Sequence, residues 1–252
     1  MKQAIARRLS SFINRFVHQP GERSEIFKRC LALQLSHEAT WRRRGSQQDT
    51  RLGSICEFGV WNGESMAMLW DSLHSLRADT SKWRLYGFDS FEGMPASDDD
   101  RDRHAFISEG SFKSEGEERV ASHLASRGVP SSAFELIPGM FDESLTEEAR
   151  AKLTVPHVCF ANIDVDYYSS TMTVLKWLEP LLFDGSLLYF DDMYFYNGNP
   201  HRGQPRAIHE FNATDERRGL TPALNVDPTG RVHVFWRDDA NESSEELQFS
   251  KS

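Results

Sequence analysis

The chain has 252 residues, of which 39% are apolar, 12% aromatic and 27% charged, and its net charge is −9. This composition is typical of a globular α/β domain and excludes collagen-like and wholly disordered chains. No apolar stretch approaches the roughly 20 residues that cross a bilayer, so we expect no membrane span. The negative charge argues against nucleic acid as a partner.

Charge is distributed unevenly along the chain. Residues 1–51 contain 11 Lys and Arg against 4 Asp and Glu, whereas the remainder has a net charge of −16, so the two parts are electrostatically complementary. The three cysteines form no CxxC pair, and two of them lie in apolar strand-like runs, where cysteine behaves as a small hydrophobe. The first twenty residues have no secretory pattern. We therefore expect a cytoplasmic protein, with an organelle transit peptide as the alternative.

The first 51 residues are expected to form a helical arm. Apolar residues recur at helical spacing near the N-terminus, namely at Ile5, Leu9, Phe12, Ile13 and Phe16. They predict an amphipathic helix over residues 2–17, whose apolar face favours docking or dimerisation over a membrane surface. A second helical pattern covers residues 24–43, before a polar cluster. We expect this arm to act as a lid or as the contact of a homodimer.

From residue 52, short apolar runs alternate with helical segments. The strand-like runs are residues 54–58, 84–88, 134–137, 158–163, 186–190 and 232–236, and the helical segments are residues 64–77, 115–128, 143–152 and 169–182. This alternation predicts an α/β fold with parallel strands, right-handed crossovers and ligands at the carboxyl ends of the strands. We expect residues 52–237 to form one domain and residues 238–252 a polar tail.

The residues after the first two strands favour an adenosine-type cofactor. Gly59 and Gly63 lie between a strand and a helix, where they allow a tight turn and expose unpaired helix N–H groups to an anion. Their spacing differs from the GxGxxG dinucleotide pattern. Asp89 ends the second strand, where it could accept hydrogen bonds from two ribose hydroxyls. The alternatives are an ordinary strand-to-helix turn and a capping aspartate.

Carboxylates follow the fourth and fifth strands. They are Asp164 and Asp166 after one strand, and Asp191 and Asp192 after the other. Neighbouring carboxylates repel each other unless they are protonated or bridged by a cation, and oxygen ligands at this density suit Mg²⁺. The alternative is that Asp166 caps a helix and Asp192 a turn.

Two loops are placed to contact an acceptor. Residues 193–203 are aromatic and glycine-rich, which predicts either an acceptor-binding loop or a packed connection. Residues 97–119 are polar and predict a solvated loop that could fold over a substrate. His201 is notable only for its place beside the carboxylates, and a surface loop position is the alternative.

These stretches together resemble the macrocin O-methyltransferase family, the class I S-adenosylmethionine enzymes that methylate sugar hydroxyls of macrolide and aminocoumarin antibiotics. The matching stretches are residues 56–63, 88–95, 138–145, 163–171, 190–192 and 204–211. The most specific are DSFEGMP from Asp89 and DVDYYSST from Asp164. The resemblance implies a Rossmann-like sheet of seven mostly parallel strands with helices on both faces. It also implies S-adenosylmethionine as methyl donor, Mg²⁺ as the ion and a role in antibiotic biosynthesis.

The resemblance also implies roles for individual residues. The cofactor set is Glu57, Gly59 and Trp61 at the methionine end, Ser65 at its carboxylate, Asp89 at the ribose, Ser90, Gly139, Met140, Phe141 and Asp142 around the adenine, and Asp164. The metal set is Asp164, Asp191 and Asp192. Asn62 departs from the arginine that is usual in the family, and the match is poor before residue 53.

The expected activity is Mg²⁺-dependent methylation of a small-molecule hydroxyl. A more distant similarity to catechol O-methyltransferase implies the same metal positions, but the catalytic lysine of that enzyme has no counterpart here. Asp166 is therefore our first candidate for the general base, and His201 is the second. The alternatives are a hydroxylase on a methyltransferase-like fold and a non-catalytic cofactor-binding module.

Overall fold

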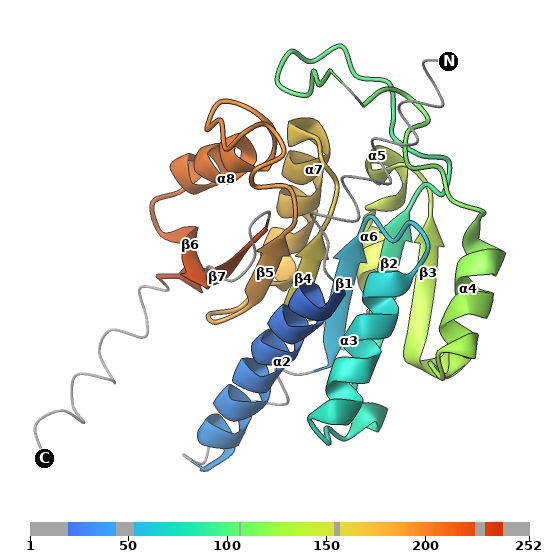
Figure 1. Ribbon diagram of the computed structural model, residues 1–252. Coiled ribbons are helices and arrows are strands. Elements are labelled where there is room, and N and C mark those ends of the chain that lie inside the picture. Colours follow the sequence, from blue (N-terminus) through green and yellow to red (C-terminus); the bar gives the residue numbers. More distant parts are fainter. Residues whose placement is uncertain (1–19, 44–52, 106, 154–156, 225–229, 239–252) are drawn as a thin grey trace, which may run out of the picture.

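The chain folds around one sheet of seven strands (Figure 1). A computed structural model describes residues 20–43, 53–105, 107–153, 157–224 and 230–238. The strands are β1 (Ser54–Phe58), β2 (Arg84–Asp89), β3 (Phe134–Pro138), β4 (Val158–Ile163), β5 (Leu187–Phe190), β6 (Arg218–Leu224) and β7 (Arg231–Arg237). Their order is β3-β2-β1-β4-β5-β7-β6, and only the pairs that involve β7 are antiparallel. The predicted mostly parallel sheet is thereby confirmed.

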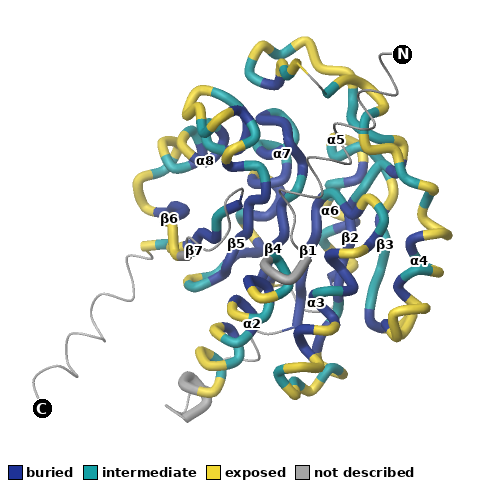
Figure 2. The backbone as a smooth tube through the Cα atoms, in the orientation of Figure 1, coloured by how far each residue is buried: buried dark blue, intermediate teal, exposed yellow. Residues whose placement is uncertain are grey.

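Helices cover both faces of this sheet. They are α2 (Pro20–Arg43), α3 (Glu64–Ser75), α4 (Glu117–Ser126), α5 (Phe141–Ser144), α6 (Glu147–Ala151), α7 (Tyr168–Leu178) and α8 (Gly203–Thr214), with 3₁₀ turns at Thr80–Lys82, Ser131–Ala133 and Glu179–Leu181. One apolar core lies under α2, α3 and α4, and a second lies under α5 to α8. Neighbouring β1 residues alternate between the two, with Ile55 in the first core and Cys56 in the second. The central strands β1, β4 and β5 are therefore buried on both sides (Figure 2).

Helix α2 is an integral part of the first core. Its apolar stripe includes Phe27, which is fully buried and lies edge-on to the rings of Phe160 and Tyr189, at centroid distances of 5.6 and 5.8 Å. Further along the helix, the Gln34 side chain donates a hydrogen bond of 2.7 Å to the carbonyl of Gly185. This part of the expected N-terminal arm is packed against the sheet. The predicted helix over residues 2–17 and the tail from residue 239 lie outside the described residues.

Two elements were not predicted from the sequence, α8 and β6. Gly219 and Pro222 interrupt the apolar pattern of β6, and such residues are tolerated because β6 is an edge strand. The late strand β7 lies between β5 and β6. The segment predicted as one helix over residues 143–152 forms two short helices, α5 and α6.

The cysteines behave as the sequence predicts. Cys30, Cys56 and Cys159 are free and buried. Burial also raises the pKa of each thiol above its usual value. Within the described ranges, no helix combines the length and apolar character that crossing a bilayer requires.

Candidate functional site

The loop after β1 lies in close contact with the ends of β2 and β4, the two strands that flank β1. Gly59 donates a backbone hydrogen bond of 2.9 Å to Phe88 at the end of β2. Its φ is +86°, and a Cβ at this position would lie 1.9 Å from the carbonyl oxygen of Asp164. Glycine is therefore required here both by backbone conformation and by close approach.

This requirement can be tested by replacing Gly59 with alanine. We expect the variant to lose ~3 kcal/mol or more of unfolding free energy, because the loop must move away from β4. Gly128→Ala is the matched control, because Gly128 has a φ of +79° but open space around its Cβ position. The control should lose only about 1 to 2 kcal/mol, the cost of a left-handed alanine. Urea unfolding measures the free energy of unfolding of both variants. Equal losses would show that the close approach of Gly59 to Asp164 does not require glycine.

Asp89 ties the glycine loop to the turn after β2. Its Oδ2 accepts the backbone N–H of Trp61 and its Oδ1 accepts that of Phe91, each at 2.7 Å. Both donors have left-handed backbones, with φ of 48° and 57°. Strained residues of this kind cluster at functional sites. Asp89 therefore stabilises the two turns, as the capping alternative predicts. Each of its oxygens still has a lone pair that could accept a hydrogen bond from a ribose hydroxyl.

Glu57 is a buried acid at the end of β1. It is 1% exposed, and its Oε1 accepts a hydrogen bond from the hydroxyl of Ser65 in the first turn of α3. Its Oε2 is buried without a hydrogen-bond partner among the described residues. Burial raises the pKa of Glu57 to about 8, although the Ser65 hydrogen bond acts in the opposite direction. An unpaired buried acceptor of this kind fits a cationic ligand group.

A cavity of about 260 Å³ lies beyond the ends of β2 and β3. It is lined by Ser90, Glu92, Pro138, Gly139, Met140 and Glu143. Three of the residues expected around an adenine are therefore in its wall. Phe141 instead places its ring edge-on to Phe58 in the second core, and Asp142 is exposed in the first turn of α5.

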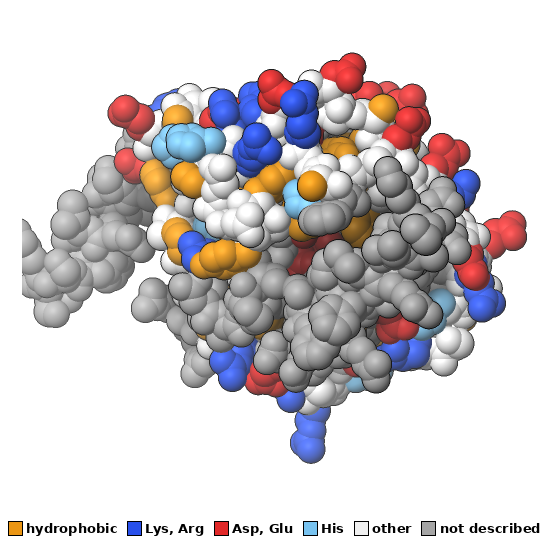
Figure 3. Space-filling model, turned by 45° about the horizontal axis from the view of Figure 1, so that its top comes forward, with side chains coloured by type: hydrophobic (Ala, Val, Ile, Leu, Met, Phe, Trp, Pro, Cys, Tyr) orange, Lys and Arg blue, Asp and Glu red, His pale blue; other side chains and the backbone are white. Residues whose placement is uncertain are grey.

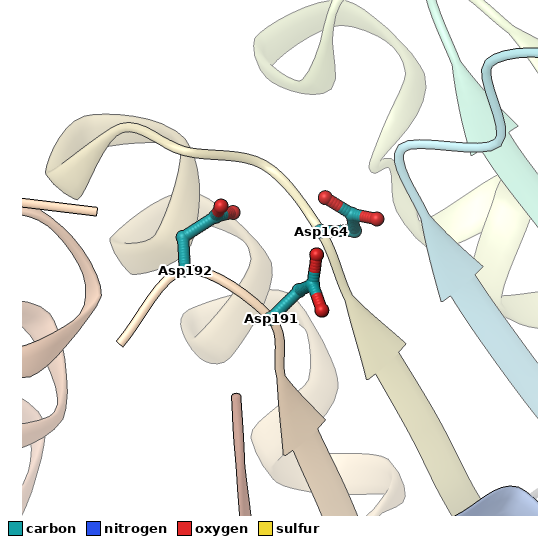
Figure 4. A group of neighbouring side chains, drawn as sticks. All are labelled: Asp164, Asp191 and Asp192. Atoms are coloured by element: carbon teal, nitrogen blue, oxygen red, sulfur yellow. The ribbon is translucent and has the colours of Figure 1, made fainter. Parts of the chain in front are cut away.

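The three predicted metal ligands are brought together at the ends of β4 and β5. Asp164, Asp191 and Asp192 each offer an oxygen within 4.8 Å of the others, and Figure 4 shows their carboxylates turned toward a common space. Asp191 is 3% exposed, and its Oδ1 accepts the Tyr189 hydroxyl at 2.8 Å. Burial and the neighbouring Asp191 raise the pKa of Asp164 to about 7. An oxygen-only cluster that resists ionisation fits a bound Mg²⁺.

Arg23 joins this cluster from α2, and sequence reasoning missed it. Its guanidinium donates to Asp164 Oδ2 at 3.1 Å and also to Asp191 Oδ2, and the side chain is only 13% exposed. Burial alone would lower the pKa of Arg23, but the two carboxylates raise it above its usual value. The partners are 141 and 168 residues away in sequence. The only signal for this contact was the opposite charge of the N-terminal segment and the body.

Asp166 and Gln204 complete the edge of the site. Asp166 is 9% exposed with a φ of 53°, and its N–H donates to Asp192 Oδ2 at 3.0 Å. Burial and the charge of Asp164 raise the pKa of Asp166 well above its usual range. Gln204 is fully buried, accepts the N–H of Asp192 and donates to the carbonyl of Ile163, both at 2.9 Å. Sequence reasoning assigned Gln204 no role, although it begins the matching stretch 204–211.

The two loops predicted to contact an acceptor, residues 97–119 and 193–203, contact each other. The ring of His104 stacks on Phe195 at 4.1 Å. Asp102 is 1% exposed and accepts the N–H of Ser169 in the first turn of α7, so the expected solvated loop has a buried anchor. His201 is exposed, and its N–H donates to the Asn199 side chain at 2.9 Å. In Figure 3, Asp or Glu side chains are visible near the middle of this face, next to hydrophobic side chains.

Comparisons with known proteins agree with this geometry. The model of the macrocin O-methyltransferase (TylF) family matches residues 44–238. Among solved structures, the O-methyltransferase NovP has a TM-score of 0.63 at 19% identity, covering 84% of this chain and 79% of its own. The calicheamicin methyltransferase CalS11 has a TM-score of 0.59 at 22% identity, with coverages of 90% and 84%.

A third similar structure is the O-methyltransferase TomG from Streptomyces achromogenes, with a TM-score of 0.55 at 17% identity and coverages of 92% and 86%. At these identities the structures support the fold alone, and no curated protein sequence matches the chain significantly. The family match spans most of the chain, including the sheet and every strand-end residue described above. The chain therefore belongs to the macrocin O-methyltransferase family and is an S-adenosylmethionine-dependent O-methyltransferase.

Proposed function

We propose that the protein methylates a hydroxyl of a natural-product sugar, with Mg²⁺ held by Asp164, Asp191 and Asp192. The observation that carries the metal assignment is the convergence of three buried or half-buried carboxylates next to the glycine loop. The sugar is supported by a second structure of CalS11, described as a TDP-rhamnose 3'-O-methyltransferase in calicheamicin biosynthesis.

The cofactor residues divide between the two ends of S-adenosylmethionine. The free Oε2 of Glu57 would accept the ammonium of the methionine moiety, and the backbone N–H of Ser65, in the first turn of α3, would donate to its carboxylate. Asp89 would accept the ribose hydroxyls while it holds the loop. Gly139 and Met140 in the cavity wall would contact the adenine.

The reaction is methyl transfer by in-line attack of the acceptor oxygen on the sulfonium methyl group, so alignment is the main task of the chain. Mg²⁺, when bound, supplies positive charge that lowers the pKa of a coordinated hydroxyl. Asp166 is our first candidate for the residue that accepts the hydroxyl proton, because it is buried beside Asp192, to which its N–H donates, and burial raises its pKa above that of an ordinary aspartate. His201 remains the second candidate.

The first test is calorimetric titration of the purified protein with S-adenosylhomocysteine, in Mg²⁺ and again in EDTA, with NAD as the negative control. We expect micromolar or tighter binding of S-adenosylhomocysteine and none of NAD. Acceptors can then be screened for a mass gain of one CH₂ unit. Failure to bind S-adenosylhomocysteine in either buffer would contradict the proposed cofactor site.

A further inference from the structure

We propose that the guanidinium of Arg23 competes with a divalent cation for Asp164 and Asp191, so that metal binding displaces the Arg23 side chain from the carboxylate cluster. The inference rests on the proposed metal site and assigns Arg23 a role in regulating the binding of metal there. The sequence predicted a helical arm for the region that contains Arg23, and no role in the site for Arg23 itself.

Arg23 already occupies carboxylate oxygens that a metal ion at this site would need. Arg23 donates to one oxygen of Asp164 and to one oxygen of Asp191. The other oxygen of Asp191 accepts the Tyr189 hydroxyl, so both of its oxygens already have a partner. Mg²⁺ binds at about 2.0 to 2.1 Å and demands near-octahedral geometry. An ion that binds Asp191 must therefore share or replace a hydrogen bond, either that of the guanidinium or that of the Tyr189 hydroxyl.

Arg23 and a metal ion would also compensate the same negative charges. Two carboxylates this close and this buried are costly unless a cation lies between them, and Arg23 supplies that cation from within the chain. A divalent ion in the same space would bring a second cation next to the guanidinium in a poorly solvated environment. Each cation compensates the same pair of acids, and therefore each should weaken the binding of the other.

Arg23 can leave the carboxylate cluster without unfolding α2. The helix is held on the sheet further along, by Phe27 against Phe160 and by Gln34 on the carbonyl of Gly185. Arg23 lies in its first turn, one turn before Phe27. Withdrawal of its long side chain requires rotation about its own bonds, and the buried stripe of the helix stays in place.

The test compares the affinity for Mg²⁺ and Mn²⁺ in the wild-type chain, in Arg23→Gln and in Arg29→Gln, by calorimetry without cofactor. Arg29 is on the same helix, is 55% exposed and pairs with Glu25. We expect Arg23→Gln to bind metal about tenfold or more tightly than wild type, a coupling in the usual range, and Arg29→Gln to match wild type. Equal or weaker metal binding by Arg23→Gln would overturn the proposal.

A second readout is thermal stability. In EDTA, Arg23→Gln should melt below wild type because its carboxylates lose their cation, and Mg²⁺ should raise its melting temperature more than that of wild type. If Arg23→Gln does not fold, Arg23→Lys serves instead, because a single ammonium bridges two carboxylates less well than a guanidinium. It too should bind metal more tightly than wild type, and failure to do so would overturn the proposal.

The two proposals fail in different ways. If wild type binds metal and the Arg23 variants bind it no more tightly, competition is wrong and the metal site stands. If neither wild type nor the variants bind metal, the metal site itself is wrong, and the competition is wrong with it.

Discussion

Replacing Asp191 with alanine is expected to abolish metal-dependent turnover while leaving the affinity for S-adenosylhomocysteine within about twofold of wild type. Asp191 is the most buried of the three carboxylates, and it contacts both Tyr189 and Arg23. Its loss removes a metal ligand, and so the affinity for Mg²⁺ should fall by more than the roughly 10- to 100-fold typical of outer-shell partners. Glu57 and Asp89, which we propose as cofactor residues, lie at the ends of β1 and β2 and keep their own hydrogen bonds.

Calorimetry with Mg²⁺ and with S-adenosylhomocysteine measures the two affinities separately. Asp191→Asn is the conservative companion, because it keeps an acceptor for the Tyr189 hydroxyl but loses the charge. Asp71→Ala is the matched control, since Asp71 is half exposed on α3 and pairs with Arg127. Full activity of Asp191→Ala in the presence of EDTA would contradict the metal assignment.

Replacing Glu57 with glutamine should have the second large effect, on cofactor binding. Glutamine keeps an acceptor for the Ser65 hydroxyl but loses the negative charge that would pair with the ammonium of S-adenosylmethionine. A lost charge-assisted hydrogen bond in a buried site costs ~1.5 to 3 kcal/mol, or about 10- to 100-fold in affinity. Calorimetric titration with S-adenosylhomocysteine, which carries the same ammonium group, measures the loss. Unchanged affinity would contradict the assignment of Glu57 to the methionine end.

The same variant should change how stability depends on pH. The pKa of Glu57 is about 8 in the folded chain and about 4.5 when the group is exposed, so the folded chain holds this proton more tightly. The wild-type free energy of unfolding should therefore fall as pH rises from about 4.5 to about 8. Glu57→Gln removes this contribution, and it should gain stability relative to wild type across that interval.

Urea unfolding of both chains at pH 5, 6.5 and 8.5, without cofactor, checks this sign. Asp164 and Asp166 also have raised pKa values, and so both proteins should lose stability with rising pH, the wild type more steeply. Glu135→Gln is a control on strand β3, which β2 separates from β1, and its carboxylate is partly exposed and pairs with Arg84. If the free energy of unfolding changed equally with pH in wild type and in Glu57→Gln, Glu57 would not be the group that holds a proton in the folded chain.

The sequence determined the sheet and the places of the strand-end carboxylates, because these depend on local patterns. Apolar runs alternating with helices imply parallel strands, and parallel strands bring their carboxyl ends to one edge. Asp89, Asp164 and Asp191 each follow a predicted strand, and the structure places them at that edge. Local pattern was weaker for β6, where glycine and proline interrupt the apolar run and the neighbouring strand pairs antiparallel.

Only the tertiary structure decided which side chains meet across that edge. Arg23 reaches Asp191 from 168 residues away, Gln204 joins the ends of β4 and β5, and Asp102 accepts from the first turn of α7. None of these contacts follows from helical or strand periodicity, because that periodicity indicates which face of an element is buried and not which polar group lies opposite. Such pairing is set by the packing of whole elements, here of α2 on the sheet, since a buried charge is stable only where packing supplies its partner.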